Sequence, residues 1–338
     1  MLTTAVAVGM SSAAQSLEQP ESPARLAVIP IPRGFYERHS IRATVVTAAN
    51  VAIVLASGPL AYAIDWLPLY FAAFVLVGAR AQALYILQHE CMHWLLYKDK
   101  RTNDRCGVLL SGLLGTGLYY GRTFHFKHHR SVGHDDDPNL IWHDSRVHLP
   151  GWATFWFFVG QLAGKRLVGI ISRSIGKPGG QPAVANSVAS ARISVDLAAV
   201  LIIQAVVVGA IWATSAWWVY FVFLLLPLAT LTSFFEAVRS FSEHVLPGER
   251  GASPAEEARL FYMDASGLER FFFSQFGFHY HHVHHLYPGV VTFKLSALHH
   301  WLRENDPSYS AKFVRRQGYV RTALRYILKQ PLVSADAA

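Results

Sequence analysis

Eight of the 17 histidines recur at tight, repeated spacings within three short segments. The first segment is His89-Glu-Cys-Met-His93, in which the i, i+4 spacing places both rings on one face of a helix. The other two segments combine a step of three residues with an adjacent ring. They contain His125, His128 and His129, and His281, His284 and His285. Neutral imidazole is a common metal ligand and unpaired buried imidazoles are costly, so the pattern predicts a metal centre.

The order HxxxH, HxxHH, HxxHH, with long hydrophobic segments between, resembles the membrane fatty acid desaturase and hydroxylase family. The resemblance extends over residues 45–305 and includes residues outside the three histidine boxes. These are Asn103, Asp104, Gly107, Arg130, Asp137-Pro138, the run Leu286-Tyr-Pro-Gly289, and Leu298-His299. The resemblance implies a non-haem di-iron oxygenase that uses O₂ and two electrons on an unactivated C–H bond of a lipid.

The resemblance also implies which residues bind the two iron ions. An additional histidine between the last span and the third box commonly completes the site in that family. His244 is the only histidine between His148 and His279, and it follows a helical continuation of the last apolar segment. The alternative is a histidine placed at a helix C-terminus by the macrodipole. The predicted metal ligands are His89, His93, His125, His128, His129, His244, His281, His284 and His285; no further catalytic or cofactor-binding side chain is predicted.

Several residues near the boxes have two interpretations. Asp135, Asp136 and Asp137 either accept hydrogen bonds from ligating histidines and orient them, or form a solvated acidic turn. Arg80 lies within an apolar segment, where a charge costs free energy unless it faces the protein interior. An internal hydrogen bond is its expected role, and a substrate headgroup is the alternative. Cys91, inside the first box, is expected to be structural.

Four apolar windows are long enough to cross a bilayer: residues 43–64, 67–87, 193–213 and 217–235. The connectors at 65–66 and 214–216 leave almost no loop, so the windows predict two hairpins. The chain is 52% hydrophobic and 15% charged, which is too apolar for an ordinary soluble domain. The expected fold is an all-α integral membrane protein: four transmembrane helices in two hairpins, with a cytoplasmic helical cap that holds the di-iron site.

The positions of the basic residues predict the orientation. Of the 30 Lys and Arg residues, only Arg80 falls inside the windows and none lies in either connector. Both termini and all three boxes should therefore be cytoplasmic, in the inner membrane if the chain is bacterial. The net charge of +8 is explained by this asymmetry and by attraction to lipid headgroups, so nucleic-acid binding is not needed.

Three regions are expected along the chain. Residues 1–40 should be a disordered cytoplasmic tail, 41–305 the desaturase-like domain, and 306–338 a cytoplasmic C-terminal tail. No cleavable signal is expected, because no basic region precedes the apolar run at 5–10. Apolar stretches at 108–120 and 152–168 suit helices that lie in the membrane interface or dip into it.

The chain has no dinucleotide-binding fingerprint, no CxxC pair and no evident haem domain. Electrons should therefore come from a separate ferredoxin or cytochrome-type protein with its reductase. The leading hypothesis is O₂-dependent desaturation of a fatty acyl chain or related lipid. One alternative is a hydroxylase, ketolase or monooxygenase acting on an alkane, carotenoid or sphingolipid.

Another class of function is a zinc-dependent membrane hydrolase or a metal transporter. A hydrolase would need a general base such as Glu90 or Glu243 beside an open zinc position. A transporter would need polar groups along its spans, and the four windows contain almost none.

Overall fold

The computed structural model describes residues 28–132, 137–138, 151–165, 187–244 and 260–330. The α-helices are α1 Ser40–Ile64, α2 Leu67–Met92, α3 Lys100–Leu114, α4 Leu118–Ser131, α5 Trp152–Leu162, α7 Ser187–Thr214, α8 Trp217–Tyr220, α9 Ser233–Glu243, α11 Gly267–Phe272, α12 His281–Leu286, α13 Thr292–Asn305 and α14 Tyr319–Ile327. Short 3₁₀ segments are η1 Arg33–Tyr36, η5 Gln275–Tyr280 and η6 Tyr309–Lys312, π segments are Phe221–Leu225 and Leu228–Thr232, and strands are β1 Leu260–Met263 and β2 Phe313–Arg316.

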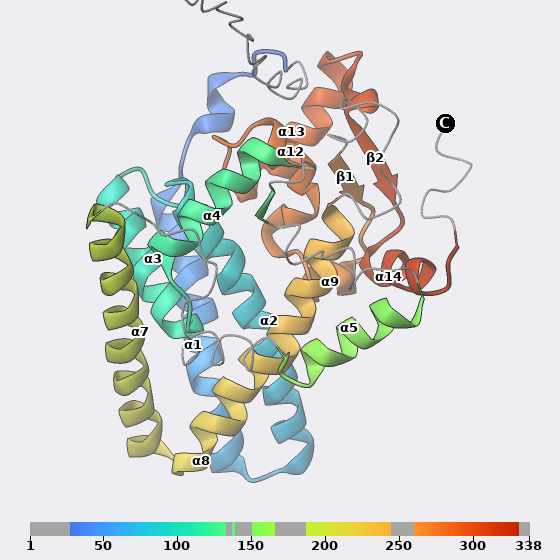
Figure 1. Ribbon diagram of the computed structural model, residues 1–338. Helices are drawn as coiled ribbons and strands as arrows, with labels where there is room; N and C mark the ends of the chain where they lie inside the picture. The colour runs from blue at the N-terminus through green and yellow to red at the C-terminus, as the bar shows by residue number, and fades with distance from the viewer. Residues whose placement is uncertain (1–27, 133–136, 139–150, 166–186, 245–259, 331–338) are drawn as a thin grey trace, which may run out of the picture.

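Four helical segments are long and apolar enough to cross a membrane, as the sequence predicted: Arg33–Ile64, Leu67–Met92, Ser194–Thr214 and Trp217–Glu243. Their ends at the short connectors form the lower end of the molecule in Figure 1, and α4, α12, α13 and both strands lie toward its upper end. The second and fourth segments are longer than expected. Their extra turns, from Gln88 and from Glu236, are polar but buried against other helices, so protein packing replaces lipid around them.

Close packing between spans depends on glycine. A Cβ atom at Gly58 of α1 would lie 2.7 Å from Phe223 Cβ, and one at Gly78 of α2 would lie 2.7 Å from Leu231 Cβ. Lipid tails are as apolar as leucine, so helices in a bilayer gain mainly from such close van der Waals contact. These glycines let the fourth span approach α1 and α2.

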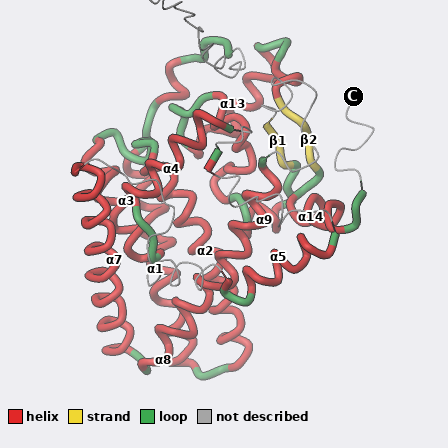
Figure 2. Tube along the Cα trace, viewed as in Figure 1, coloured by secondary structure: helices red, strands yellow, loops and turns green. Residues whose placement is uncertain are grey.

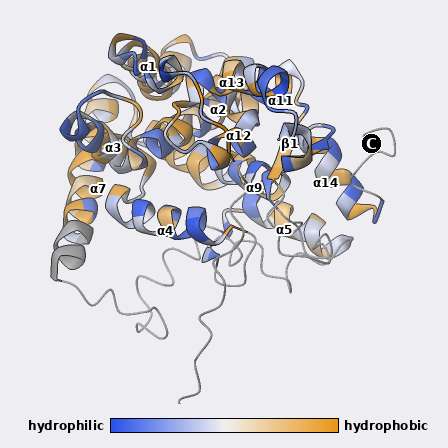
Figure 3. Ribbon diagram, turned by 90° about the horizontal axis from the view of Figure 1, so that it is seen from above, coloured by the Kyte–Doolittle hydropathy of each residue, from blue (hydrophilic) through white to orange (hydrophobic). Residues whose placement is uncertain are grey.

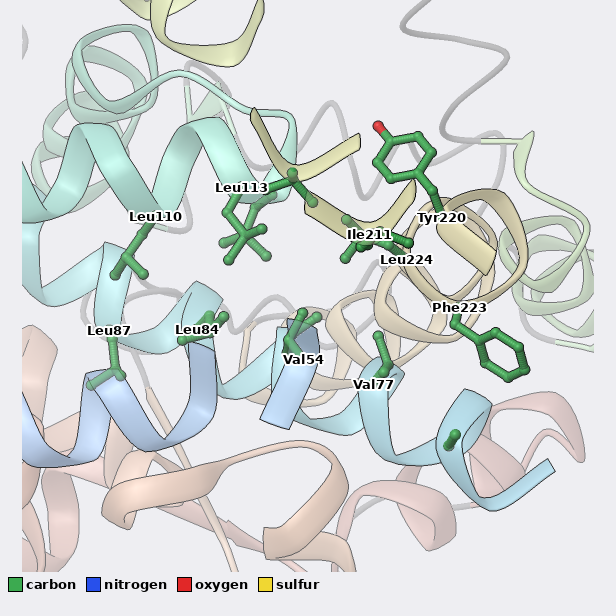
Figure 4. Close-up of a cluster of buried hydrophobic side chains, with 14 of the residues drawn as sticks. Val54, Val77, Leu84, Leu87, Leu110, Leu113, Ile211, Tyr220, Phe223 and Leu224 are labelled. Carbon is green, nitrogen blue, oxygen red and sulfur yellow. The ribbon is translucent and has the colours of Figure 1, made fainter. Parts of the chain in front are cut away.

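A buried apolar cluster joins the spans to α3. Figure 4 shows Leu110 and Leu113 of α3 beside Leu84 and Leu87 of α2, with Ile211 of α7 close to Leu224. All of these side chains are buried. Helix α3 therefore packs as part of the bundle, although its first half is charged.

The stretch 108–120 is not one interfacial helix. Helix α3 ends at Gly115, which has φ 68°, and α4 begins at Leu118. A side chain of α7 caps the end of α3: Gln204 donates to the carbonyls of Gly112 and Leu113, at 2.7 and 2.9 Å. The break follows from glycine, because the left-handed conformation that ends α3 carries no steric cost for this residue.

The fourth span contains two π-helical segments on either side of Pro227. Proline lacks an N–H, and Ser233 Oγ donates to the carbonyl of Leu228 at 3.0 Å. Such insertions change the helical register and are frequent at functional sites. They set the face that α9 presents to the histidine boxes.

The C-terminal region packs against the rest of the chain. Strand β2 pairs in parallel with β1, with Leu260 opposite Phe313, so the fold contains two short strands in addition to its helices (Figure 2). Helices α11 to α13 supply the crossover that parallel pairing requires. Tyr309 and Tyr319 are fully buried, so packed chain continues past residue 305, where a tail was expected.

Candidate metal centre

The three histidine boxes meet at one end of the spans. His89 and His93 close α2, the second box lies on α4, and the third box forms most of α12. Seen from above, α4 carries strongly hydrophilic residues, whereas α7 is mainly apolar (Figure 3). The boxes are thus held on rigid helices that converge from different directions.

Five histidines form the first group: His89, His93, His125, His129 and His284. Each offers a ring nitrogen, and these nitrogens all lie within 4.8 Å of one another. Four Nε2 atoms make a closed ring of contacts: His93 to His125 at 2.6 Å, His125 to His129 at 2.9 Å, and His284 to His129 and His93 at 3.2 Å each. The centre of such a ring is roughly 2 Å from each nitrogen, which is a metal–nitrogen bond length.

His128, His244 and His285 form the second group, again within 4.8 Å of one another. The Nε2 atoms of His128 and His244 are 3.2 Å apart. His281 is outside both groups by this measure, but its ring centroid lies 4.5 Å from that of His285 and 5.4 Å from that of His244. Its buried Nε2 has no hydrogen-bond partner in the described part of the chain. The structure therefore brings together all nine predicted histidines, with His281 at the margin of the second group.

Burial favours the uncharged form of seven of these rings. It lowers the pKa of His93 to about 3, of His129 to about 2 and of His244 to about 3. The pKa values of His125, His281, His284 and His285 are lowered as well, first by burial and then by neighbouring histidines. Neutral rings have free lone pairs at neutral pH, and a cation between them would satisfy several at once. The donor set fits a metal that prefers nitrogen ligands.

A sequence model of the family described as fatty acid desaturase matches residues 64–317, which is more than half of the chain. The chain belongs to the fatty acid desaturase family. It is also 31% identical over 157 residues to an omega-3 fatty acid desaturase, chloroplastic, from Brassica napus. That match covers 42% of this chain and 38% of the relative's length. The four apolar helices agree with a membrane protein.

In this desaturase-family chain, each box has one histidine whose Nδ1 atom contacts a buried carboxylate, and a different carboxylate serves each box. Asp137 lies 2.9 Å from His128, Glu90 lies 3.2 Å from His89, and Glu243 lies 3.0 Å from His281. A carboxylate can only accept, so the Nδ1 atom carries the proton and Nε2 keeps its lone pair. For Asp137 this contact favours the interpretation as an acceptor that orients a ligating histidine, over a solvated acidic turn. Asp135 and Asp136 lie outside the described residues.

Sequence patterns did not reveal this role for Glu90 and Glu243. Glu90 also accepts from the backbone N–H of Thr292 at 2.8 Å, which ties α2 to the start of α13. Glu243 accepts from Arg239 Nη1 at 2.5 Å and from Tyr319 Oη at 2.7 Å. The i, i+4 spacing of Arg239 and Glu243 was a visible sign of pairing, whereas contacts with Thr292 and Tyr319 depend on the tertiary fold.

Arg122 fixes α4 against the end of α2. Its Nε and Nη2 atoms donate to the carbonyls of Met92 and Cys91 at 2.9 Å each, and Nη2 also pairs with Asp104 at 2.5 Å. The guanidinium lies over the Trp94 ring, 4.0 Å from its centroid. This contact sets the position of the second box relative to the first. Cys91 is buried in the apolar cluster and belongs to neither group, as expected.

The other described histidines near the third box stay outside both groups. His282 Nε2 and His299 Nδ1 contact Tyr309 Oη at 3.0 and 2.8 Å. Only 2% of His299 is exposed, because η6 covers it. His300, its neighbour, is exposed. The rings of His282 and His299 have a packing role.

Proposed function

We propose that the two histidine groups hold two iron ions and that this chain catalyses O₂-dependent desaturation of a fatty acyl chain or related lipid. The observation that carries the proposal is the pair of adjacent groups of buried and half-buried imidazoles in a chain of the fatty acid desaturase family. One iron would be held by the group that contains His93 and His125. The other would be held by His128, His244 and His285, with His281 beside them.

The bound iron pair would supply an oxidant, from O₂ and two external electrons, strong enough to take hydrogen from a methylene group. Two hydrogens leave adjacent carbons, a C=C bond forms, and O₂ with two electrons and two protons becomes two waters. The chain's own residues keep the ligands neutral and oriented: Glu90, Asp137 and Glu243 hold Nδ1 protons away from the metal. Burial of the rings limits access of water.

The zinc-hydrolase alternative loses its general base. Glu90 and Glu243 contact the Nδ1 atoms of box histidines, so neither carboxylate lies at the Nε2 atom that would bind the metal. Glu90 also accepts a hydrogen bond from Thr292, and Glu243 accepts hydrogen bonds from Arg239 and Tyr319. A carboxylate in that position orients a ligand; it does not activate a water.

The proposal includes an orientation and an electron source. Both termini and the histidine end of the spans would face the cytoplasm, because Lys and Arg are excluded from the connectors at the opposite end. A separate one-electron carrier, a ferredoxin or a cytochrome, would reduce the iron.

Metal and product analysis test the proposal together. Protein purified anaerobically should contain two irons per chain, and with an external reductant it should consume O₂ and add one double bond to an acyl chain. Mass spectrometry of the products distinguishes desaturation from hydroxylation: an alcohol in place of an alkene would assign a hydroxylase. Stoichiometric zinc without iron in active protein would defeat the di-iron proposal.

A further inference from the structure

A second polar site lies next to the third box. A pocket of about 470 Å³ opens where α2, α11, η5 and α13 meet. Its polar lining consists of Arg80, Arg270, Ser274, Gln275, His279 and Ser296. The volume is within the range of small-molecule sites. None of these residues belongs to the two histidine groups.

Buried polar atoms of the lining residues lack partners within the described part of the chain. They are His279 Nδ1, Gln275 Oε1 and Arg80 Nε. His279 is only 6% exposed, so an unmade hydrogen bond there costs free energy. Gln275 is held in place through its Nε2 atom, which donates to the carbonyls of Phe271 and Ala79. These three atoms leave the lining residues with unused hydrogen-bonding capacity for a ligand that has both acceptor and donor groups.

The pocket carries two positive charges. Arg80 Nη2 donates to the carbonyl of Phe271 at 2.9 Å, and its guanidinium lies 4.2 Å from the centroid of the Phe271 ring. The structure gives the Arg270 side chain no hydrogen bond or ion pair with any described residue. The nearby carboxylates are already engaged: Asp264 pairs with Arg315, and Glu269 accepts from backbone N–H groups of Ser266 and Val320. An anion is therefore the missing counterpart.

The backbone connects this pocket to the metal centre. Phe276 and Gly277 both have positive φ, 62° and 90°, so the chain turns sharply between the pocket and the third box. The next residue, Phe278, stacks on His281 with ring centroids 4.6 Å apart. A left-handed conformation is strained for phenylalanine and is typical of functional segments.

We propose that this pocket binds the phosphate of an anionic membrane lipid, as the headgroup site for the lipid substrate. The inference rests on the proposed function, because the bound lipid is a substrate only if the chain is a lipid desaturase. A lipid is favoured over a soluble anion because Arg80 belongs to an apolar span and α11 beside it exposes Leu268 and Phe271. Arginine pairs well with phosphate oxygens, and Gln275 Oε1 accepts from a headgroup hydroxyl.

Binding measured on the full-length protein in detergent tests the pocket. The probes are dioctanoyl phosphatidylglycerol, the neutral dioctanoylglycerol and inorganic phosphate. Arg270→Gln should weaken phosphatidylglycerol binding by about tenfold and leave dioctanoylglycerol binding unchanged. Arg270 makes no described side-chain bond, so this variant should fold normally. The matched control is Arg303→Gln, which removes an exposed arginine of α13 outside the pocket and should bind as the unaltered protein does.

Equal binding of phosphatidylglycerol by Arg270→Gln and the unaltered protein would overturn the proposal. So would competition by inorganic phosphate at the same concentration as the lipid, because it would identify a free-phosphate site. The readout needs neither iron nor turnover. An active desaturase in which Arg270→Gln leaves phosphatidylglycerol binding unchanged would exclude the pocket alone. Arg270-dependent lipid binding by an active protein that holds zinc and no iron would exclude the proposed function alone.

Discussion

A carboxylate at Nδ1 decides which nitrogen of a histidine can reach a metal. His128 is a clear case, because both oxygens of Asp137 lie within 3.0 Å of its Nδ1 atom. The ring must then present Nε2 to His244. Removing the negative charge removes this preference and makes the ring a weaker donor to metal.

Asp137→Asn should therefore lower the affinity for the iron bound by the second group by about tenfold to a hundredfold. Chelator competition followed by iron analysis measures this change. The control is Glu304→Gln, which alters an exposed carboxylate of α13. Unchanged iron retention in Asp137→Asn would mean that the contact has only a packing role.

His244 completes the second group from a different helix. Its Nδ1 atom donates to the carbonyl of Ser240 at 2.7 Å, which leaves Nε2 as the acceptor that faces His128. His244→Ala should leave about one iron per chain and abolish turnover, because the second group keeps too few ligands. Iron analysis and circular dichroism on the same sample separate metal loss from unfolding. His300→Ala, at an exposed histidine, should keep both irons; a His244→Ala protein with two irons and full turnover would exclude His244 as a ligand.

At the scale of elements, the second box depends on a contact from α7. Asp196 accepts hydrogen bonds from the backbone N–H groups of Leu118, Tyr119 and Tyr120, at 3.0 to 3.2 Å. These are unsatisfied donors at the start of α4, and a negative charge is favoured there by the helix dipole. The carboxylate acts as an N-cap supplied by another helix.

Asp196→Asn should destabilise the protein by about 1 kcal/mol, as loss of a cap typically does. Because α4 carries three of the histidines, a parallel decrease in iron content is expected. Thermal unfolding in detergent and iron analysis measure the two effects. Asp65→Asn is the matched control: Asp65 lies in an exposed connector with φ 50°, which asparagine tolerates. Equal stability of the two variants would contradict the capping role.

Sequence patterns predicted the elements that depend on local composition. The four apolar segments were found because each is long and contains at most one charged residue, Arg80 in the second window and Asp196 in the third, and the boxes because their spacings are helical. The π segments around Pro227 were not found, because two extra residues in a uniformly apolar span change no hydropathy signal. The buried C-terminal region was missed for another reason: Tyr319 gains its partner Glu243 only after folding, across 76 residues.

At the scale of the whole molecule, exposed tryptophans lie at two levels of the bundle. Trp66 lies in one short connector and Trp217 directly follows the other, and Trp152 and Trp156 lie on α5, which runs across the direction of the spans in Figure 1. Tryptophan favours membrane interfaces because its ring is amphipathic. We expect these two levels to mark the two faces of the bilayer, with the histidine groups beyond the α5 side.

Site-directed labelling of intact cells tests that orientation. The chain has two cysteines, Cys91 and Cys106, which would first be replaced. An impermeant thiol reagent should label Asp65→Cys and Thr214→Cys from outside, because both positions are exposed in the short connectors. It should label Glu304→Cys only after the membrane is permeabilised, since α13 lies at the histidine end, on the side to which the basic residues are confined. Labelling of Glu304→Cys in intact cells would reverse the topology and place the electron donor on the opposite face.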